Sequence, residues 1–208
     1  MNLGEDIQSQ VLFNDLDLAS SLKTYLSEMD TSFWELDTHR QTLYDGVHGD
    51  TKSIIYRMTN TEGDIGETTV STPTPSHITD KVYEVVDKMI KAKGNDRGND
   101  HGTRTRVLRL MFVKLIPGGE IAPHQDYNNL LLSHRIHFVV KNNSNCIFKI
   151  GDTESNLTEF NFIEGECFEL NNSKVHAVKN DGEEDRIHLI CDILFEGDPS
   201  LSTINTRL

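Results

Sequence analysis

The chain has 208 residues, a hydrophobic fraction of 36% and a formal net charge of -13, so one domain with a sizeable core is expected. The acidic balance argues against a nucleic-acid partner, which would require clustered Lys and Arg to neutralise phosphates. The three cysteines lie singly in apolar segments, and neither a signal peptide nor a membrane-length apolar run is present, which predicts a soluble cytoplasmic protein with free thiols and no membrane partner.

The first elements alternate between strand and helix. Residues 11–13 predict a short strand. Asp15 or Asp17 can then cap a helix, because apolar side chains recur at helical spacing over residues 18–29. A second strand is expected at residues 53–56, where apolar residues again follow one another.

A long loop and a helix come next. Residues 60–77 are rich in Thr, Gly and Pro and predict a loop that is either a lid or an unstructured connection. Residues 78–90 carry an apolar stripe at helical spacing and predict an amphipathic helix. Residues 93–102 predict a polar connection rich in turns.

After residue 105 the pattern changes to short apolar runs separated by turns. This spacing predicts a mainly β fold, an antiparallel barrel or double-sheet jelly roll, with the N-terminal helices on one outer face. We expect residues 1–105 to form a helical and mixed elaboration of the β core at 106–208, within one compact domain. The predicted strands are residues 107–116, 135–141, 146–150, 158–163, 167–170 and 186–195.

The last of these strands has two different faces. One face is apolar and carries Ile187, Leu189, Cys191 and Ile193. The other carries Arg186, His188, Ile190 and Asp192. Ionisable groups on one face of a strand are typical either of a solvated edge or of a wall of a ligand cavity.

A candidate metal site lies in residues 113–126, which read VKLIPGGEIAPHQD. If this segment is extended, His124 and Asp126 lie on the same face. They would supply two of the three ligands of the two-His, one-carboxylate set that binds non-heme Fe(II), so a third ligand is needed from another strand. His176 is a candidate, and Arg186 follows it by ten residues at the start of the last strand.

This order of motifs resembles the Fe(II)- and 2-oxoglutarate-dependent dioxygenases, in particular their aspartyl/asparaginyl β-hydroxylase-like branch with its cupin-type double-stranded β-helix. The resemblance covers residues 107–195 and rests on PGGEIAPHQD (117–126), RIH (135–137), GECFELNNSKVHAVKN (165–180) and RIHLICD (186–192).

The resemblance implies roles for individual residues. His124, Asp126 and His176 would bind Fe(II), Arg186 would bind the distal carboxylate of 2-oxoglutarate, and Arg135 would assist at the other end of this co-substrate. Further groups that could support the site or face the substrate are His137, His188, Trp34 and Arg57.

The implied reaction is the O2-dependent hydroxylation of a C–H bond, with release of succinate and CO2. Some members of the branch lack the acidic ligand, but Asp126 is present here. The substrate would be a small molecule or a peptide: a free amino acid such as proline, or an Asp, Asn or Pro side chain. The sequence carries no signature for the substrate or for the oligomeric state.

Three alternative interpretations of the sequence stand beside this one. A non-catalytic cupin or jelly-roll binding module would share the fold without requiring iron. A cupin dioxygenase usually employs three histidines and a Glu and lacks the trailing Arg, so Arg186 argues against it. A second His-x-Asp pair, His48 and Asp50, has His101 downstream, but His101 lies in a Gly-rich polar stretch and no Arg follows at the required interval.

Overall fold

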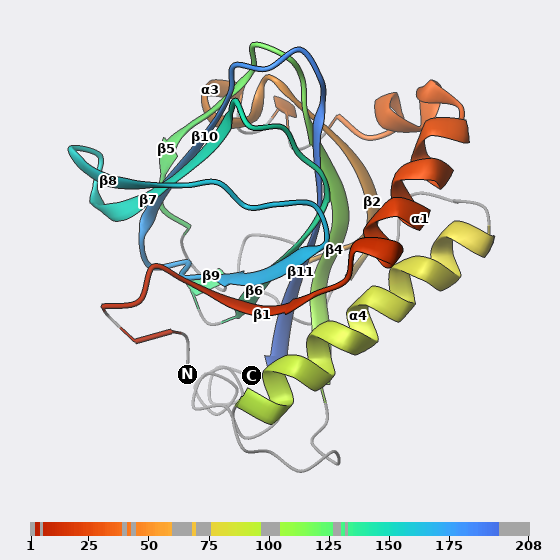
Figure 1. Cartoon of the computed structure of the whole chain (residues 1–208), viewed down its shortest axis with the longest axis horizontal. Helices are drawn as coiled ribbons and strands as arrows, with labels where there is room; N and C mark the ends of the chain where they lie inside the picture. Colours follow the sequence, from red (N-terminus) through yellow and green to blue (C-terminus); the bar gives the residue numbers. More distant parts are fainter. Residues whose placement is uncertain are drawn as a thin grey trace.

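The computed structural model describes residues 3–4, 6–38, 41–42, 45–59, 68–69, 76–96, 105–126, 130–131 and 133–195. Two antiparallel sheets pack against each other, and two long helices cover the outer face of the larger sheet (Figure 1). This arrangement is a double-stranded β-helix with N-terminal helices, so the predicted fold class is confirmed.

The two long helices are the predicted ones. Helix α1 (Leu16–Glu28) begins after Asp15, whose carboxylate accepts a hydrogen bond from the backbone N–H of Leu18 at 3.0 Å. Helix α4 (Ser76–Asp96) contains the predicted apolar stripe. Both stripes are buried against the larger sheet in one hydrophobic core. The burial of these stripes explains why the two helices pack on the same face.

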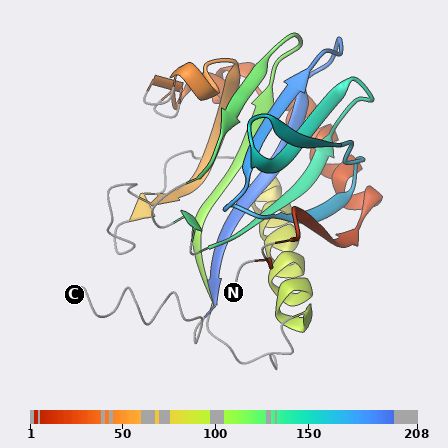
Figure 2. The same cartoon turned by 90° about the vertical axis from the view of Figure 1, so that its left-hand side faces the viewer.

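The larger sheet has seven strands in the order β1-β9-β6-β11-β4-β2-β3. The long strands β4 and β11 pair along their whole length near the middle of this sheet (Figure 2). The first half of the chain contributes β1, β2 and β3 to it. Its strands are β1 (Ser9–Asn14), β2 (Thr51–Thr59), β3 (Thr68–Thr69), β4 (Thr105–Leu115), β6 (His134–Lys141), β9 (Glu166–Leu170) and β11 (Arg186–Phe195).

The smaller sheet has four strands in the order β5-β10-β7-β8. Apolar side chains from both sheets meet in a second core, which includes Phe148 and Phe168. A short 3-10 helix, η1 (Thr31–Glu35), and helix α3 (Asp45–His48) follow α1 along the chain and precede β2. The strands of the smaller sheet are β5 (Glu120–His124), β7 (Cys146–Thr153), β8 (Asn156–Phe160) and β10 (Val175–Asn180).

Strand β11 has the two faces that its sequence predicts. Its apolar positions join the helix-side core, and its opposite face is turned toward the smaller sheet. Every residue of β11 is buried. The ionisable groups of its inner face are therefore enclosed between the sheets, and the strand is not a solvated edge.

A tight turn separates β4 from β5. Gly118 has a φ of +74°, a conformation that residues with a Cβ rarely adopt. At Gly119 a Cβ atom would lie 2.9 Å from the Cβ of Asp50 and 3.0 Å from the carbonyl oxygen of Ile116. The two glycines allow the chain to reverse sharply, which places β5 in the smaller sheet beside β10.

Two predictions about connections need comment. The prediction of a polar connection from residue 93 is wrong at its start, because α4 continues to Asp96. The buried ammonium group of Lys93, 2.7 Å from Glu169, ties this last turn to the sheet. Of the predicted loop at 60–77, only β3 and the first residues of α4 are described, so the lid hypothesis falls outside the described residues.

No described helix is both long enough and apolar enough to pass through a membrane.

Candidate functional site

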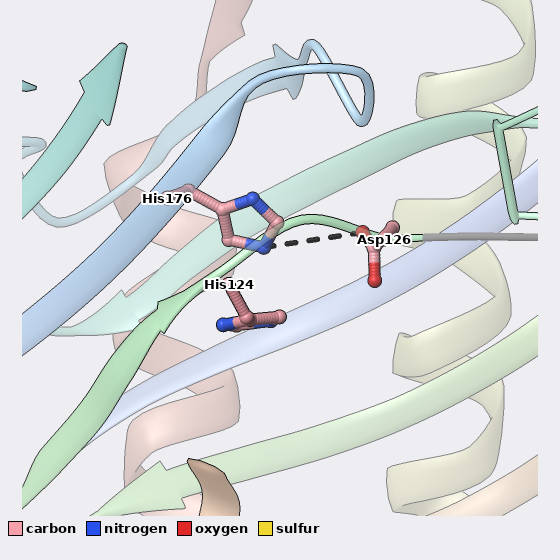
Figure 3. A group of neighbouring side chains, drawn as sticks. All are labelled: His124, Asp126 and His176. Atoms are coloured by element: carbon pink, nitrogen blue, oxygen red, sulfur yellow. Dashed lines mark ion pairs between the residues drawn. The ribbon is translucent and has the colours of Figure 1, made fainter. Parts of the chain in front are cut away.

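Three side chains that are distant in sequence meet where β5 ends. His124 is the last residue of β5, Asp126 follows two residues later, and His176 lies on the neighbouring strand β10. One ligand atom from each residue lies within 4.8 Å of the other two. In Figure 3 the ring of His176 is directed at Asp126, and the distance between Nε2 and Oδ2 is 3.9 Å.

The orientation of the two imidazoles is set by the local backbone. His124 and His176 are opposite each other in the β5–β10 pairing. Nδ1 of His124 is 2.8 Å from the carbonyl oxygen of Ala122, and Nδ1 of His176 is 3.1 Å from that of Lys174. A protonated Nδ1 that donates to a carbonyl leaves the Nε2 lone pair available, which is a common arrangement for metal-binding histidines.

The electrostatics of the cluster suit a cation. Burial raises the pKa of Asp126, but the charges of Arg135, His176 and His124 outweigh it and lower the pKa to about 2. Burial lowers the pKa of His176 to about 4, against the opposing charge of Asp126. At neutral pH the carboxylate is ionised and the imidazole is neutral, which are the protonation states that metal binding requires.

Arg135 lies next to the cluster in an unexpected arrangement. Its Nη1 donates a hydrogen bond to Oδ2 of Asp126. Its Nε and Nη2 donate to the two carboxylate oxygens of Asp192, at 2.8 and 3.0 Å. Its guanidinium therefore lies between two carboxylates of the protein, and its predicted role at one end of the co-substrate stays a prediction.

Arg186 lies at a separate, fully enclosed position. It lines a small cavity together with Cys146, Phe148 and His188. The residue is 1% exposed, and burial lowers the pKa of its guanidinium to about 10. Among the residues that the structure describes, no carboxylate forms an ion pair with Arg186; its Nη2 lies 2.7 Å from Nδ1 of His188.

His137 and His188 line the same interior. Their Nδ1 atoms are 3.3 Å apart, and the ring of His137 stacks on Phe168 with a centroid distance of 5.0 Å. Burial, followed by the charges of Arg186 and His137, lowers the pKa of His188 well below its usual value. Within the described part of the chain, the buried Nε2 of His188 has no hydrogen-bond partner.

Trp34 lies in the helix-side core and Arg57 lies on β2 opposite Leu110, and their suggested role at the substrate stays a prediction. Trp34 is buried in the helix-side core, with Nζ of Lys114 4.4 Å from its ring centroid. An irregularity in β2 pairs Arg57 with Leu110, a residue of the helix-side core, while Met58 packs against the inner apolar cluster. This β-bulge changes the alternation of side chains, which cannot be read from the sequence.

The second His-x-Asp pair is close to the first. His48 packs edge-on against His124, with ring centroids 5.2 Å apart, and Asp50 accepts a hydrogen bond from the backbone N–H of Glu120 at 3.0 Å. His101 lies outside the described residues. Among the residues described, the only group of three or more metal-ligating side chains is the cluster of His124, Asp126 and His176.

Sequence reasoning missed the role of Asp192 and did not single out Arg109. Asp192 is fully buried, and Nε of Arg109 lies 4.0 Å from its Oδ2. The sequence places Asp192 on the ionisable face of its strand with Arg186 and His188, but it does not indicate a role for this residue. Its partners could not be read from the sequence, because they lie on strands β4 and β6.

Comparisons with solved structures agree with this fold. The Pseudomonas putida prolyl-4-hydroxylase matches with a TM-score of 0.56 and 15% identity, over 91% of this chain and 92% of that one. A prolyl hydroxylase from Trichoplax adhaerens, in complex with a peptide of the hypoxia inducible factor oxygen degradation domain, matches with a TM-score of 0.56 and 13% identity. The match covers 94% of this chain and 87% of that one. A 2OG-Fe(II) oxygenase family oxidoreductase from Burkholderia pseudomallei matches with a TM-score of 0.56 and 12% identity, over 84% of this chain and 89% of that one.

Sequence comparison identifies the family. No curated protein sequence matches the chain. The sequence model for aspartyl/asparaginyl β-hydroxylases matches residues 81–195, which is more than half of the chain and runs from α4 to the end of β11. The chain therefore belongs to the aspartyl/asparaginyl β-hydroxylase family of 2-oxoglutarate-dependent dioxygenases, enzymes that require Fe(II), 2-oxoglutarate and O2.

Proposed function

We propose that this chain hydroxylates a C–H bond of an amino-acid-like substrate, with Fe(II) held by His124, Asp126 and His176. Arg186 would bind the distal carboxylate of 2-oxoglutarate. The observation that carries this proposal is the pairing of two features in one interior: a three-residue ligand cluster, and a buried guanidinium without a carboxylate partner among the described residues.

The ligand cluster fits non-heme iron. Two imidazole nitrogens and one carboxylate oxygen on one side of a metal leave the remaining coordination positions open. The two histidines are fixed by carbonyl groups two residues earlier in the chain, and the carboxylate is fixed by Arg135. When bound, the iron centre supplies the oxidation of a substrate C–H bond by O2, coupled to the conversion of 2-oxoglutarate to succinate and CO2.

The interior fits a dicarboxylate. A buried cation without a counterion is costly, and a carboxylate ligand offsets that cost by a charge-assisted, two-donor hydrogen bond. His188 lines the same cavity, and among the described residues its Nε2 has no hydrogen-bond partner. Phe148 connects the two parts of the site, since its ring lies 5.6 Å from Cζ of Arg186 and 6.4 Å from the ring of His176.

The surrounding side chains exclude water. Aromatic rings of Phe148, Phe162 and Phe168 form a packed wall of the interior, with the last two stacked at a centroid distance of 3.5 Å. In a low-dielectric interior the interaction of Arg186 with an anionic ligand is stronger than it would be in water. The chain thus provides an aromatic wall beside the ligand cluster.

The class of substrate is inferred from the family and from similar structures. The family model describes enzymes that act on aspartyl and asparaginyl groups, and two of the similar structures are prolyl hydroxylases, one of them bound to a peptide. These support a free amino acid, or an Asp, Asn or Pro side chain in a peptide, as the substrate.

The first experiment is optical and stoichiometric. Anaerobic protein with one equivalent of Fe(II) and 2-oxoglutarate should show a weak visible charge-transfer band. The His124→Ala variant should lose this band while keeping the wild-type circular dichroism spectrum. A well-folded wild-type protein without the band would contradict the proposal.

The second experiment identifies the substrate. Succinate formation is measured against a panel of free amino acids and Asp-, Asn- or Pro-containing peptides. A true substrate should raise succinate release above the uncoupled background and yield a product heavier by one oxygen atom. Iron binding without any such product would instead favour a binding module.

A further inference from the structure

Asp126 differs from the two histidines in how it is held. His124 and His176 lie on paired strands, and Nδ1 of each ring lies near the carbonyl oxygen of the residue two positions earlier in the chain. Asp126 lies beyond the end of β5, outside the strand ladder. Its carboxylate is fixed from another part of the molecule, by the guanidinium of Arg135 on β6.

Arg135 is in turn oriented by Asp192. Strand β11 lies between β6 and β4, and the register places Asp192 opposite Arg135 on one side and Arg109 on the other. Asp192 accepts hydrogen bonds from Nε and Nη2 of Arg135, the side-on edge of the guanidinium. Only Nη1, at the far corner, reaches Asp126.

This division of donors has a chemical consequence. An Arg and a carboxylate readily form a bidentate pair that occupies both carboxylate oxygens. Such a pair between Arg135 and Asp126 would compete with a metal ion for the same two oxygens. Asp192 occupies the side-on edge of Arg135, and among the described residues Asp126 accepts a hydrogen bond from Arg135 on Oδ2 only, the oxygen that lies 3.9 Å from Nε2 of His176.

We propose that Asp192 is a positioning residue of the metal site, which acts through Arg135 to orient the carboxylate of Asp126 toward the two histidines. This proposal rests on the proposed function, because it assumes that Asp126 is a ligand. It also assigns Arg135 to the metal side of the site, and leaves the co-substrate to Arg186.

The burial of the group explains how it can be held rigidly. Asp192 is 0% exposed and Arg135 is 8% exposed, and both are embedded in the central strands of the larger sheet. Arg109, with Nε 4.0 Å from Oδ2 of Asp192, adds a second positive charge beside this carboxylate. Ionic hydrogen bonds in such an interior are directional and well ordered, and partners of this kind typically change metal affinity by 10- to 100-fold when removed.

The test is a double-mutant cycle on metal affinity, with Co(II) titrated into protein without iron. Asp192→Asn should weaken Co(II) binding by roughly 10- to 100-fold, as should Arg135→Gln. The double variant should bind Co(II) no more weakly than Arg135→Gln alone, because Asp192 acts through Arg135. Full additivity of the two losses would overturn the proposal.

A matched control separates positioning from general destabilisation. Glu169 is also a buried, ion-paired carboxylate of the same sheet, but its partners His134 and Lys93 lie away from the ligand cluster. Glu169→Gln should keep the wild-type Co(II) affinity and visible spectrum. Asp192→Asn should alter the visible Co(II) spectrum, because the carboxylate ligand is displaced.

The remaining outcomes are also decisive. If Asp192→Asn does not fold, the double variant with Arg135→Gln, which keeps the net charge of the wild type, is compared with Arg135→Gln alone. A further loss of Co(II) affinity in the double variant would overturn the proposal. If Arg135→Gln leaves Co(II) affinity unchanged but weakens 2-oxoglutarate binding at saturating metal, Arg135 is a co-substrate residue and the proposal is wrong. Wild-type protein that binds no metal would refute the proposed function itself, whereas wild-type binding with unchanged Asp192→Asn affinity would refute only this inference.

Discussion

The guanidinium of Arg186 lies over the ring of Phe148, with Cζ 5.6 Å from the ring centroid. The same ring also stacks with the imidazole of His176, at a centroid distance of 6.4 Å and an interplanar angle of 20°. A single aromatic side chain on β7 therefore contacts both the buried cation and one of the candidate ligands. This contact relates two groups that come from different sheets and makes them walls of one interior.

Replacement of Arg186 by Met should weaken 2-oxoglutarate binding by about one to two orders of magnitude, since a charge-assisted hydrogen bond contributes roughly 1.5–3 kcal/mol. The effect should be specific for the distal carboxylate. Binding of 2-oxobutyrate, a 2-oxo acid without that group, should be nearly unchanged. Isothermal titration of both acids into the metal-loaded variant checks this, and an equal loss for the two acids would argue against the assigned role.

Stability should depend on pH through His188. Burial, followed by Arg186 and His137, keeps the pKa of His188 in the folded protein well below 6.5, so the unfolded state binds a proton that the folded state does not. The free energy of unfolding is therefore highest above about pH 6.5, the pKa of His188 in the unfolded chain. It falls by ~1.4 kcal/mol per pH unit as the pH decreases from there toward the pKa of His188 in the folded protein. Urea unfolding of metal-free protein at pH 7 and pH 5 should show this loss, and His188→Gln should reduce it. An unchanged pH dependence in the variant would exclude His188 as its source.

The sequence predicts those parts of the fold that follow from local periodic patterns of side chains. The alternation from Arg186 to Phe195 correctly assigns one face of β11 to the helix-side core and the other to the interior. The capping role of Asp15 and the stripe of α4 are likewise local patterns. Such features depend on neighbours a few residues away, and can therefore be read without knowledge of the fold.

Features that depend on register are not visible in the sequence. Arg135 and Asp192 are 57 residues apart, and only the pairing of β6 with β11 brings their side chains together. The irregularity after Ile55 likewise changes which side chains of β2 face the interior. The sequence motif therefore locates the ligand cluster but does not reveal the ion pairs that hold Asp126.

Gly165 should not tolerate a side chain. Its φ is +86°, and a Cβ there would lie 2.8 Å from the backbone N and Cα of Leu16, at the start of α1. The residue also accepts a hydrogen bond from the backbone N–H of Asp15 at 2.8 Å, so the strain would be transmitted to the helix N-terminus. We expect Gly165→Ala to lower the free energy of unfolding by on the order of 1–3 kcal/mol. Equilibrium urea unfolding measures this, with Gly46→Ala, a site with open space around it, as the control.

The buried pair of Lys93 and Glu169 anchors the last turn of α4 to β9. Their charged atoms are 2.7 Å apart, and the two residues are 3% and 1% exposed. Lys93→Met should reduce the free energy of unfolding by about 3–5 kcal/mol, because it leaves a buried carboxylate without its cation. Adding Glu169→Gln should recover part of this loss, since the neutral amide no longer requires a counterion and can still hydrogen-bond to His134, the other partner of Glu169. Urea unfolding of the two single variants and the double variant measures the coupling, and a double variant less stable than Lys93→Met would contradict the expectation.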